Sequence, residues 1–445
     1  MNLTVTPGAS LQGKTGLPGD KSISHRAALL AAMAEGESQI ENFLISGVTC
    51  AILGALSSLG VGWALDETRL MVQSQGWQSW RPPAAPINCG NSATTLRLLA
   101  GALAAAGVPA ILDGTPSLRL RPMKRIVEPL QQMGVAITGE DGRAPLRLSQ
   151  STYPLRPLDY TLPVASAQVK SCLLLAALAA HGRTTLHEPA PSRDHTERLL
   201  RSLGIDITCE QLYQEHFTSP QFLTQLNPPR HLRLPPLRLK VPGDFSAAAF
   251  LIVAALITPE SQVTLTNVGL NPTRTGLLDA LTTMGADIQI SQWREQNGEP
   301  IGTLTIQASS LHGIQVEGSL VVRMIDEFPA FSIAAAYAQG KTVVRQAEEL
   351  RYKESDRIAA MCQELRALGV DVEEVQDGFS IQGGAILRGG IVQSHGDHRL
   401  AMALAIAGLA SQEPVTVKNA EVIDESFPAF GEKLRNLGGR LMLEG

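Results

Sequence analysis

The stretch that decides the fold is SAQVKSCLLLAALAAHGRTTLHEPAPSRDHTERLLRSLGIDITC, at residues 166–209. Its first half joins a polar cluster at 166–168 to an Ala- and Leu-rich run at 169–180, which predicts a helix. Because this run is apolar nearly all round, the helix is expected to be buried on most sides. A short strand is expected after it, at 184–187.

The second half of the stretch predicts an amphipathic helix, a glycine stop and another strand. Three leucines fall on one face of residues 196–203, while charged residues occupy another face. Gly204 follows at once, and glycine at this place is typical of a left-handed helix C-cap, where a Cβ would be strained. A strand at 205–209 completes a unit of buried helix, strand, amphipathic helix and strand.

The same unit recurs six times along the chain. The second helical pattern of each copy ends in Leu-Gly or Met-Gly, at Leu59-Gly60, Met133-Gly134, Leu203-Gly204, Met284-Gly285, Leu368-Gly369 and Leu437-Gly438. In the other five copies the first strand is expected at 38–43, 109–113, 262–268, 342–346 and 415–418. Six concordant copies indicate an internal repeat, and a repeat this long favours closed domains over an open array.

The repeat also suggests how the chain divides. At 445 residues it exceeds what one hydrophobic core usually serves, so two domains are expected. Residues 211–240 lack clean periodicity and contain two Pro-Pro pairs, as an excursion between units would. A new copy begins at 241–244, which places three copies on each side.

Composition narrows the classes of partner and cofactor. The net charge of −5 and the absence of a long basic run argue against a nucleic-acid partner. Five scattered cysteines form no CxxC pair, and His395 and His398 flank Asp397 without a third ligand at a suitable spacing, so no metal site is expected. The longest apolar run, 247–257, is far shorter than the roughly 20 residues of a membrane span. With no signal-peptide pattern either, we expect a cytoplasmic location and no membrane partner.

The polar ends of the buried helices are the candidate site. If these helices run parallel within a domain, their N-termini share one face, where free N–H groups and the helix dipoles attract anions. The helix starts and nearby loops carry Lys21, Ser22, Arg26, Asn91, Ser92, Arg97, Arg119, Arg121, Lys124, Ser166, Gln168, Arg193, Asp326, Glu327, Arg351, Lys353, Glu354, Arg357, Asp397, His398 and Arg399. Arg and Lys bind phosphates and carboxylates, and Asp and Glu can transfer protons. The set predicts a site for phosphorylated acids in a cleft between the domains.

Simpler interpretations of the same residues stay open at this point. Taken singly, the cations are compatible with solvated surface charges. Asp326 has Pro329 shortly after it, as a helix cap would. Glu354 has Lys353 and Arg357 within pairing distance along the chain, as a surface ion pair would.

Across residues 18–430 the chain resembles the 5-enolpyruvylshikimate-3-phosphate synthase family. The matching strings are GDKSISHR at 19–26, GNSAT at 90–94, RPM at 121–123, SAQVK at 166–170, RDHT at 193–196, PGD at 242–244, NPTR at 271–274, Asp326-Glu327, KESDR at 353–357 and DHR at 397–399. Each string alone is weak or moderate evidence, but their number and order make the set specific.

The resemblance implies an α/β fold of two domains, the enolpyruvyl transferase fold, in which each domain holds three βαβαββ repeats around buried parallel helices. This is an inside-out α/β barrel. The first domain would span residues 20–241, and the second would combine residues 1–19 with 242–445. The active site would lie in the interdomain cleft.

The resemblance also implies the activity and the site residues. The family transfers the enolpyruvyl group of phosphoenolpyruvate to the 5-hydroxyl of shikimate 3-phosphate through a tetrahedral intermediate, in the shikimate pathway of aromatic amino acid biosynthesis, without a cofactor. Shikimate 3-phosphate would be held by Ser22, Arg26, Ser166, Ala167, Gln168, Arg193, Asp326 and Lys353. Phosphoenolpyruvate would be held by Lys21, Ala93, Arg121, Gln168, Arg357 and Arg399. The catalytic residues would be Asp326, Glu354 and Lys21, with Asp326 taking the hydroxyl proton and Glu354 protonating the methylene carbon; the enzyme is expected to be a monomer.

Two departures from the family pattern bear on ligand binding. Ala93 stands where many members have glycine, and Leu98 replaces a common proline. Because an added methyl narrows a close-packed ligand site, the chain resembles the glyphosate-tolerant class, and weak glyphosate binding is expected. Glu425 replaces a lysine of many members, which puts one phosphate contact in doubt.

Two alternative functions were weighed. UDP-N-acetylglucosamine enolpyruvyl transferases resemble this fold but carry a reactive cysteine in the loop that corresponds to residues 114–123, and this loop has none. A non-catalytic anion-binding relative is the other alternative, and the presence of both Asp326 and Glu354 disfavours it.

Overall fold

The computed structural model describes residues 1–149, 154–212, 221–229 and 233–444. Its contacts divide the chain into two compact units. Unit 1 comprises residues 1–18, 242–295 and 300–445, and unit 2 comprises residues 19–241 and 296–299. The chain therefore crosses between the units four times, twice at the base of a hairpin whose tip, 296–299, groups with unit 2.

Unit 2 alternates helices and short strands. Its helices are α1 (Lys21–Met33), α2 (Gly47–Ser58), α3 (Ala93–Ala106), α4 (Pro116–Arg119), α5 (Lys124–Gln132), α6 (Ala167–Ala177) and α7 (His195–Ser202). A 3-10 turn, η1 (Trp77–Ser79), lies between α2 and α3. Its strands are β3 (Glu35–Glu41), β4 (Gly62–Asp66), β5 (Arg69–Gln75), β6 (Ile87–Asn88), β7 (Ala110–Asp113), β8 (Ile137–Glu140), β9 (Arg143–Leu148), β10 (Asp159–Thr161), β11 (Thr184–Glu188), β12 (Asp206–Leu212), β13 (Gln221–Asn227) and β14 (Arg238–Lys240).

Unit 1 has the same alternation. Its helices are α8 (Phe245–Ile257), α9 (Gly276–Thr283), α10 (Ser319–Arg323), α11 (Phe328–Tyr337), α12 (Arg357–Ala367), α13 (His398–Ala407) and α14 (Phe430–Asn436), with 3-10 turns η2 (Glu348–Tyr352) and η3 (Ala420–Glu425). Its strands are β1 (Asn2–Thr6), β2 (Gln12–Gly16), β15 (Gln262–Gly269), β16 (Asp287–Gln296), β17 (Glu299–Gln307), β18 (Gln315–Val316), β19 (Gly340–Val344), β20 (Asp371–Val375), β21 (Gly378–Gly383), β22 (Gly390–Gln393), β23 (Val415–Lys418) and β24 (Arg440–Glu444).

The sheets of the described chain show the repeat directly. Unit 2 has sheets β10-β11-β13-β12, β14-β3-β5-β4 and β6-β7-β9-β8, and unit 1 has β22-β23-β1-β24, β16-β17-β15-β2 and β18-β19-β21-β20. Each sheet contains one parallel edge pair, such as β10 with β11, next to an antiparallel pair, such as β11 with β13. Distant segments complete some of them: β1 and β2 from the chain's start lie in unit 1 sheets.

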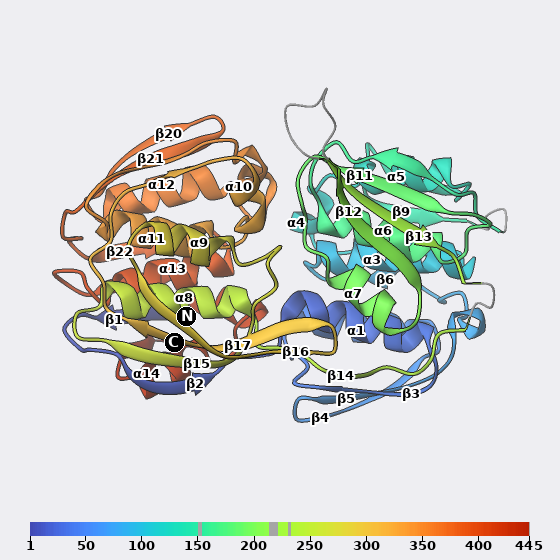
Figure 1. Cartoon of the computed structure of the whole chain (residues 1–445), viewed down its shortest axis with the longest axis horizontal. Helices are drawn as coiled ribbons and strands as arrows, with labels where there is room; N and C mark the ends of the chain where they lie inside the picture. The colour runs from blue at the N-terminus through green and yellow to red at the C-terminus, as the bar shows by residue number, and fades with distance from the viewer. Residues whose placement is uncertain (150–153, 213–220, 230–232, 445) are drawn as a thin grey trace. The chain divides into compact units, whose positions relative to one another are not determined.

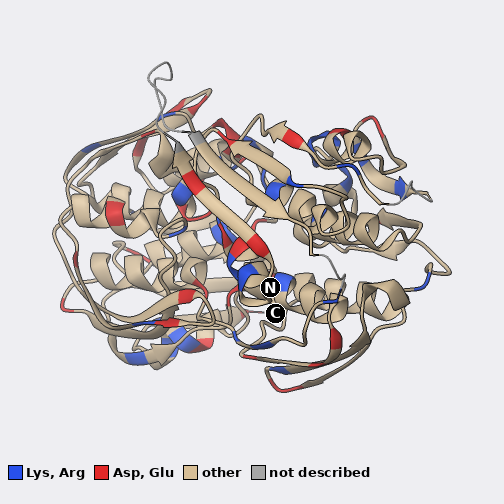
Figure 2. Cartoon of the chain, turned by 45° about the vertical axis from the view of Figure 1, so that its right-hand side comes forward, with Lys and Arg blue, Asp and Glu red and all other residues tan. Residues whose placement is uncertain are grey.

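Each unit is built around its own set of apolar helices. In unit 1, α8, α11 and α13 pack on one another behind the sheets, and in unit 2 α3 packs on α1 and α6 (Figure 1). Every residue of α8 from Phe245 to Leu256 is buried. The inner helices carry few charged residues, which lie mainly in loops and near helix ends (Figure 2). The expected α/β architecture of three repeats per unit around buried helices is confirmed.

The six repeat-ending glycines adopt the backbone conformation that the sequence predicts. Gly60, Gly134, Gly204, Gly285, Gly369 and Gly438 all have positive φ, between +81° and +105°. Glycine reaches this region without the steric penalty of a Cβ. Each second helix therefore ends where a side chain would be strained.

Some element boundaries differ from expectation. The strand expected at 342–346 is β19, which begins two residues earlier, and the strand expected at 38–43 is β3, which begins three earlier. The segment 211–240, taken as an excursion, contains β13 and β14, and β13 is an inner strand of its sheet. Part of it, 213–220 and 230–232, lies outside the described residues. Across the described ranges no helix has both the length and the apolar character of a membrane span.

Candidate active site

The expected site residues divide between the two units. Those in unit 2 are Lys21, Ser22, Arg26, Ala93, Arg121, Ser166, Ala167, Gln168 and Arg193. Those in unit 1 are Asp326, Lys353, Glu354, Arg357 and Arg399.

Arg26 ties the start of α1 to two other helices of unit 2. Asp20 caps α1 by accepting a hydrogen bond from the Ile23 amide at 2.9 Å, so Lys21 and Ser22 form the first turn. One turn later, Arg26 Nε donates to Thr196 Oγ1 at 2.7 Å and Nη2 donates to Ser171 Oγ at 2.8 Å. The guanidinium is thereby fixed between α1, α6 and α7.

Gln168, in the first turn of α6, is linked to the first turns of α3. Its amide nitrogen donates to Thr94 Oγ1 at 2.9 Å, and its amide oxygen accepts from Arg97 Nη1 at 2.6 Å. Ala93 is the first residue of α3 and is buried. Gln168 therefore links the start of α6, where Ser166 lies, to the start of α3, where Ala93 lies. Arg97, which sequence reasoning left out of the binding set, holds Gln168 in place.

The two remaining cations of unit 2 lie on loops. Arg121 lies in the turn between α4 and α5, and its amide donates to the Leu118 carbonyl at 3.1 Å. Arg193 precedes α7 and directly follows Ser192, whose hydroxyl donates to the Glu188 carboxylate. These contacts fix the backbone beside each arginine.

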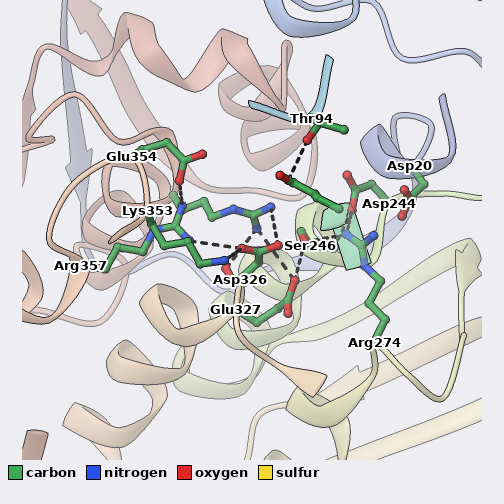
Figure 3. A network of polar contacts seen from close by, with 12 residues as sticks. Asp20, Thr94, Asp244, Ser246, Arg274, Asp326, Glu327, Lys353, Glu354 and Arg357 are labelled. Atoms are coloured by element: carbon green, nitrogen blue, oxygen red, sulfur yellow. Dashed lines mark hydrogen bonds and ion pairs between the residues drawn. The ribbon is translucent and has the colours of Figure 1, made fainter. Parts of the chain in front are cut away.

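In unit 1, Arg357 is surrounded by three carboxylates. Its Nε donates to Asp397 Oδ2 at 2.8 Å, and its Nη2 donates to Glu354 Oε2 at 2.7 Å. Its Nη1 donates to Asp326 Oδ1 at 3.4 Å. Figure 3 shows Asp326 and Glu354 on either side of the guanidinium. We call Arg357, Asp326, Glu354 and Asp397 the Arg357 cluster.

Two further expected residues contact Asp326. Lys353 Nζ donates to Asp326 Oδ1 at 3.3 Å, and Arg399 Nη1 donates to the Asp326 carbonyl at 3.1 Å. Helix α11 begins at Phe328 with Glu327 at its N-cap position. Asp326 is therefore not the cap that the simpler interpretation suggested, and its carboxylate faces cations instead.

Exposure separates the carboxylates of the Arg357 cluster. The side chains of Asp326 and Glu354 are 17% and 19% exposed, whereas that of Asp397 is fully buried. Burial alone lowers the pKa of Arg357, but Asp397, Glu354 and Asp326 together raise it above its usual range. Burial likewise opposes ionisation of Asp397, yet Arg357 holds the pKa of that carboxyl below its usual value. Asp397 is thus a fixed anion, while the other two carboxylates reach the surface.

A second buried network lies behind Asp326. Arg274 Nη2 donates to Asp244 Oδ1 and to Ser246 Oγ, both at 2.7 Å, and Ser246 donates to the Glu327 carboxylate (Figure 3). The sequence analysis included Arg274 only within the string NPTR and missed its connection to Glu327. The sequence signal that could have indicated this network was the presence of Asp244 in the string PGD and of Arg274 in the string NPTR.

Glu425, which replaces a lysine of many family members, lies close to Arg399, an expected phosphoenolpyruvate contact. Glu425 ends η3, and its carboxylate lies 3.6 Å from His398 Nδ1, the residue before Arg399. His395 Nε2 instead contacts Glu364 Oε1 at 2.6 Å. The two histidines that flank Asp397 therefore contact different carboxylates.

The fold and these clusters define a class of α/β transferase that binds phosphorylated acids with Arg and Lys and carries carboxylates for proton transfer. The family model of EPSP synthase (3-phosphoshikimate 1-carboxyvinyltransferase) matches residues 5–434. The chain belongs to this family.

Relatives and solved structures agree over nearly the whole chain. The chain is 48% identical to a 3-phosphoshikimate 1-carboxyvinyltransferase of Roseiflexus castenholzii, covering 96% of this chain and 97% of the relative. It is 44% identical to that of Desulfitobacterium hafniense, covering 98% and 97%. The solved EPSP synthase of Acinetobacter baumannii matches with a TM-score of 0.85 at 39% identity, covering 99% of this chain and all of that one.

Family membership confirms the expected activity. The chain is a transferase of aromatic amino acid biosynthesis that passes the enolpyruvyl group of phosphoenolpyruvate to shikimate 3-phosphate. These matches do not favour the UDP-N-acetylglucosamine enzyme or a non-catalytic relative.

Proposed function

We propose that Asp326 and Glu354 carry the proton transfers of this reaction, one on each side of Arg357. The observation that supports this assignment is that one buried guanidinium contacts both carboxylates, at 3.4 Å and 2.7 Å, while both stay partly exposed. A buried cation fixes the separation of the two groups without itself exchanging protons, because arginine stays charged.

The proposed chemistry proceeds by addition and elimination. Asp326 accepts the proton of the shikimate 5-hydroxyl as the oxygen bonds to C2 of phosphoenolpyruvate, and Glu354 donates a proton to C3. The C2–O bond to phosphate then breaks, C3 returns a proton to the Glu354 carboxylate to restore the double bond, and phosphate leaves. Glu354 must be protonated at the first step, which the negative charges of bound substrate favour against the pull of Arg357.

We propose that each unit supplies part of the substrate contacts. Shikimate 3-phosphate is bound by Ser22, Arg26, Ser166, Ala167, Gln168 and Arg193 of unit 2 and by Asp326 and Lys353 of unit 1. Phosphoenolpyruvate is bound by Lys21, Ala93, Arg121 and Gln168 of unit 2 and by Arg357 and Arg399 of unit 1. Lys21 adds positive charge where charge spreads onto the leaving phosphate.

Phosphate release tests the reaction. We expect release from phosphoenolpyruvate with shikimate 3-phosphate as acceptor, and none with UDP-N-acetylglucosamine. Mass spectrometry of the product should show the added enolpyruvyl group. Release with the sugar nucleotide alone would overturn the choice of acceptor.

We also propose that Ala93 weakens glyphosate binding. Ala93 is the first residue of α3 and its side chain is buried beside the helix start that meets Gln168 through Thr94. A methyl at such a position takes space that glycine would leave. Ala93→Gly should lower the inhibition constant for glyphosate at least tenfold, and an unchanged constant would contradict this role.

We propose, finally, that the enzyme acts as a cytoplasmic monomer. Light scattering coupled to size-exclusion chromatography should give the mass of one chain, 47.4 kDa. Fractionation of the source cells should place the protein with the cytoplasmic enzymes. A mass of two chains, or recovery with membranes, would contradict the proposal.

A further inference from the structure

Unit 2 contains a buried charged cluster that the proposed mechanism does not use. Lys170 Nζ lies 2.6 Å from Glu188 Oε2 and 2.7 Å from Glu197 Oε1. The three side chains are 3%, 1% and 1% exposed. We call these residues the Lys170 cluster; it joins helix α6, the end of β11 and helix α7.

Lys170 lies next to two proposed shikimate 3-phosphate contacts, Ser166 and Arg193. The Lys170 amide donates to the carbonyl of Ser166 at 3.0 Å, one turn back along α6. Lys170 Nζ also donates to the Ser192 carbonyl at 3.4 Å, and Ser192 directly precedes Arg193. The ammonium group therefore links the Arg193 loop to helix α6, one turn after the Ser166 end of that helix.

Hydroxyl groups beside the cluster extend it to a third contact. Ser171 follows Lys170 and Thr196 precedes Glu197, and their hydroxyl oxygens lie 2.6 Å apart. Arg26 donates to both hydroxyls, at 2.8 Å and 2.7 Å. The ion pair between α6 and α7 thus runs beside the polar contact that fixes Arg26.

Stability alone gives little reason to bury these charges. Taking ions out of water is costly, and replacing a buried ion pair by apolar side chains of similar volume is often neutral or stabilising. Burial raises the pKa of Glu197, although Lys170 opposes that shift. A cluster that is expensive for the fold but adjoins three ligand contacts is better explained by geometry than by stability.

We propose that Lys170, held between Glu188 and Glu197, is a positioning residue that sets the arrangement of Arg193, Arg26 and the start of α6 for shikimate 3-phosphate. Lys170 does not touch the substrate. This inference rests on the binding roles proposed above for those residues. Loss of the Lys170 ammonium group should weaken shikimate 3-phosphate binding and leave phosphoenolpyruvate binding nearly unchanged.

Lys170→Met tests the proposal, because it removes the cation and keeps most of the side-chain volume. Calorimetry should show the Kd for shikimate 3-phosphate raised about tenfold, with the KM for phosphoenolpyruvate at saturating shikimate 3-phosphate within about twofold of wild type. Adding Glu197→Gln should restore part of the lost affinity, because fewer uncompensated buried charges remain. Equal changes for both substrates, or a lower Tm with unchanged Kd, would overturn the proposal.

Glu364→Gln is the matched control. Glu364 is also buried and also contacts a nitrogen-bearing side chain, the imidazole of His395, but it adjoins no proposed shikimate 3-phosphate contact. It should lower Tm without changing either affinity. If Lys170→Met does not fold, Glu197→Gln alone should still raise the Kd about threefold, and an unchanged Kd there would refute the role.

Hydrogen exchange gives a readout that needs no substrate. Backbone amides of residues 189–195 should exchange at least tenfold faster in Lys170→Met than in wild type, and at the wild-type rate in Glu364→Gln. Unchanged exchange in Lys170→Met would overturn the positioning role itself. Faster exchange with an unchanged shikimate 3-phosphate Kd would instead reject the proposed binding role of the Arg193 loop.

Discussion

The two units each enclose a buried cation among carboxylates, but they expose different parts of the cluster. In unit 2 the Lys170 cluster is wholly buried, and only neighbouring residues such as Arg193 belong to the proposed binding set. In unit 1 Arg357 is 1% exposed, whereas Asp326 and Glu354 keep 17% and 19% of their side-chain surface. In our proposals the same arrangement positions a binding loop in unit 2 and holds the acid–base groups in unit 1.

The difference follows from the choice of cation. Lysine offers a point charge on a flexible stem and holds backbone and carboxylates together at one place. The arginine guanidinium is planar and has donors on several sides, so Arg357 donates to three carboxylates in different directions. Two of these carboxylates, those of Asp326 and Glu354, are thereby kept apart. A repeated fold can therefore use one buried cation to support a binding loop and another to hold the proposed acid–base groups.

Removing an acid–base group of unit 1 should have the largest effect. Asp326→Ala or Glu354→Gln should lower kcat by roughly 10² to 10⁴-fold, the usual worth of a positioned proton donor or acceptor. Calorimetric binding of shikimate 3-phosphate should persist in both. Glu374→Gln, which alters a more exposed carboxylate paired with Arg351, should leave kcat within about twofold; normal turnover in either test variant would remove its assignment.

Acid should weaken unit 2 through His25. Burial above all lowers the pKa of His25 to about 4, against an unfolded value near 6.5. Because the folded pKa is depressed, this stabilising contribution is complete above about pH 6.5 and is lost as pH falls towards 4. The loss is about 3 kcal/mol by the linkage relation.

Urea unfolding of wild type and His25→Gln between pH 7.5 and 4.5 checks this expectation. The wild-type transition should shift to lower urea on acidification more than that of the variant. In unit 1, Asp397 has a lowered pKa, so its contribution should persist over this range and be lost only below about pH 3.9. Equal pH dependence of the wild type and His25→Gln would contradict the role of His25.

Asp397→Asn should have a smaller effect than the changes above. It should weaken binding of phosphoenolpyruvate, whereas Lys170→Met should weaken binding of shikimate 3-phosphate. Asparagine keeps an acceptor for the Arg399 amide at the start of α13 but removes the charge that holds Arg357. We expect the KM for phosphoenolpyruvate to rise about tenfold, with the Kd for shikimate 3-phosphate nearly unchanged. If the two variants affected the same substrate, the separate roles proposed for Lys170 and Asp397 would be contradicted.

The smallest effects are expected at the repeat glycines. Gly204→Ala in unit 2 should cost roughly 1 kcal/mol from backbone strain alone, since a Cβ would meet nothing within 4 Å. Gly438→Ala in unit 1 should cost more, because its Cβ would lie 2.8 Å from the Ser10 carbonyl oxygen. Unfolding free energies from urea titration check the order; a larger loss at Gly204 would reverse it.

Much of the fold could be predicted because each repeat carries local signals. The glycine stops, the capping residues and the apolar helices act over a few residues. The residues that cap helices are Asp20, Ser92, Ser166, Asp244 and Asp397. Strand β13 was missed because the sequence of residues 211–240, in which it lies, lacks clean periodicity.

The candidate site was predicted as a set of residues but not as a network. The sequence identified Lys170 only as part of a matching string and Asp397 only as one of the polar groups at the helix starts. Sequence spacing gives no distance between Lys170 and Glu197 or between Arg357 and Asp397. Those pairs meet across different helices, and only the folded chain brings them within 2.8 Å. Arg97 was missed as a support of Gln168 for the same reason.

Deuterium incorporation tests the central claim most directly. With wild type in D₂O, mass spectrometry should find deuterium at the methylene carbon of product and of recovered phosphoenolpyruvate. Glu354→Gln, still binding shikimate 3-phosphate, should incorporate at least a hundredfold more slowly. Incorporation at the wild-type rate in this variant would contradict the assignment of Glu354 as the proton donor held by Arg357.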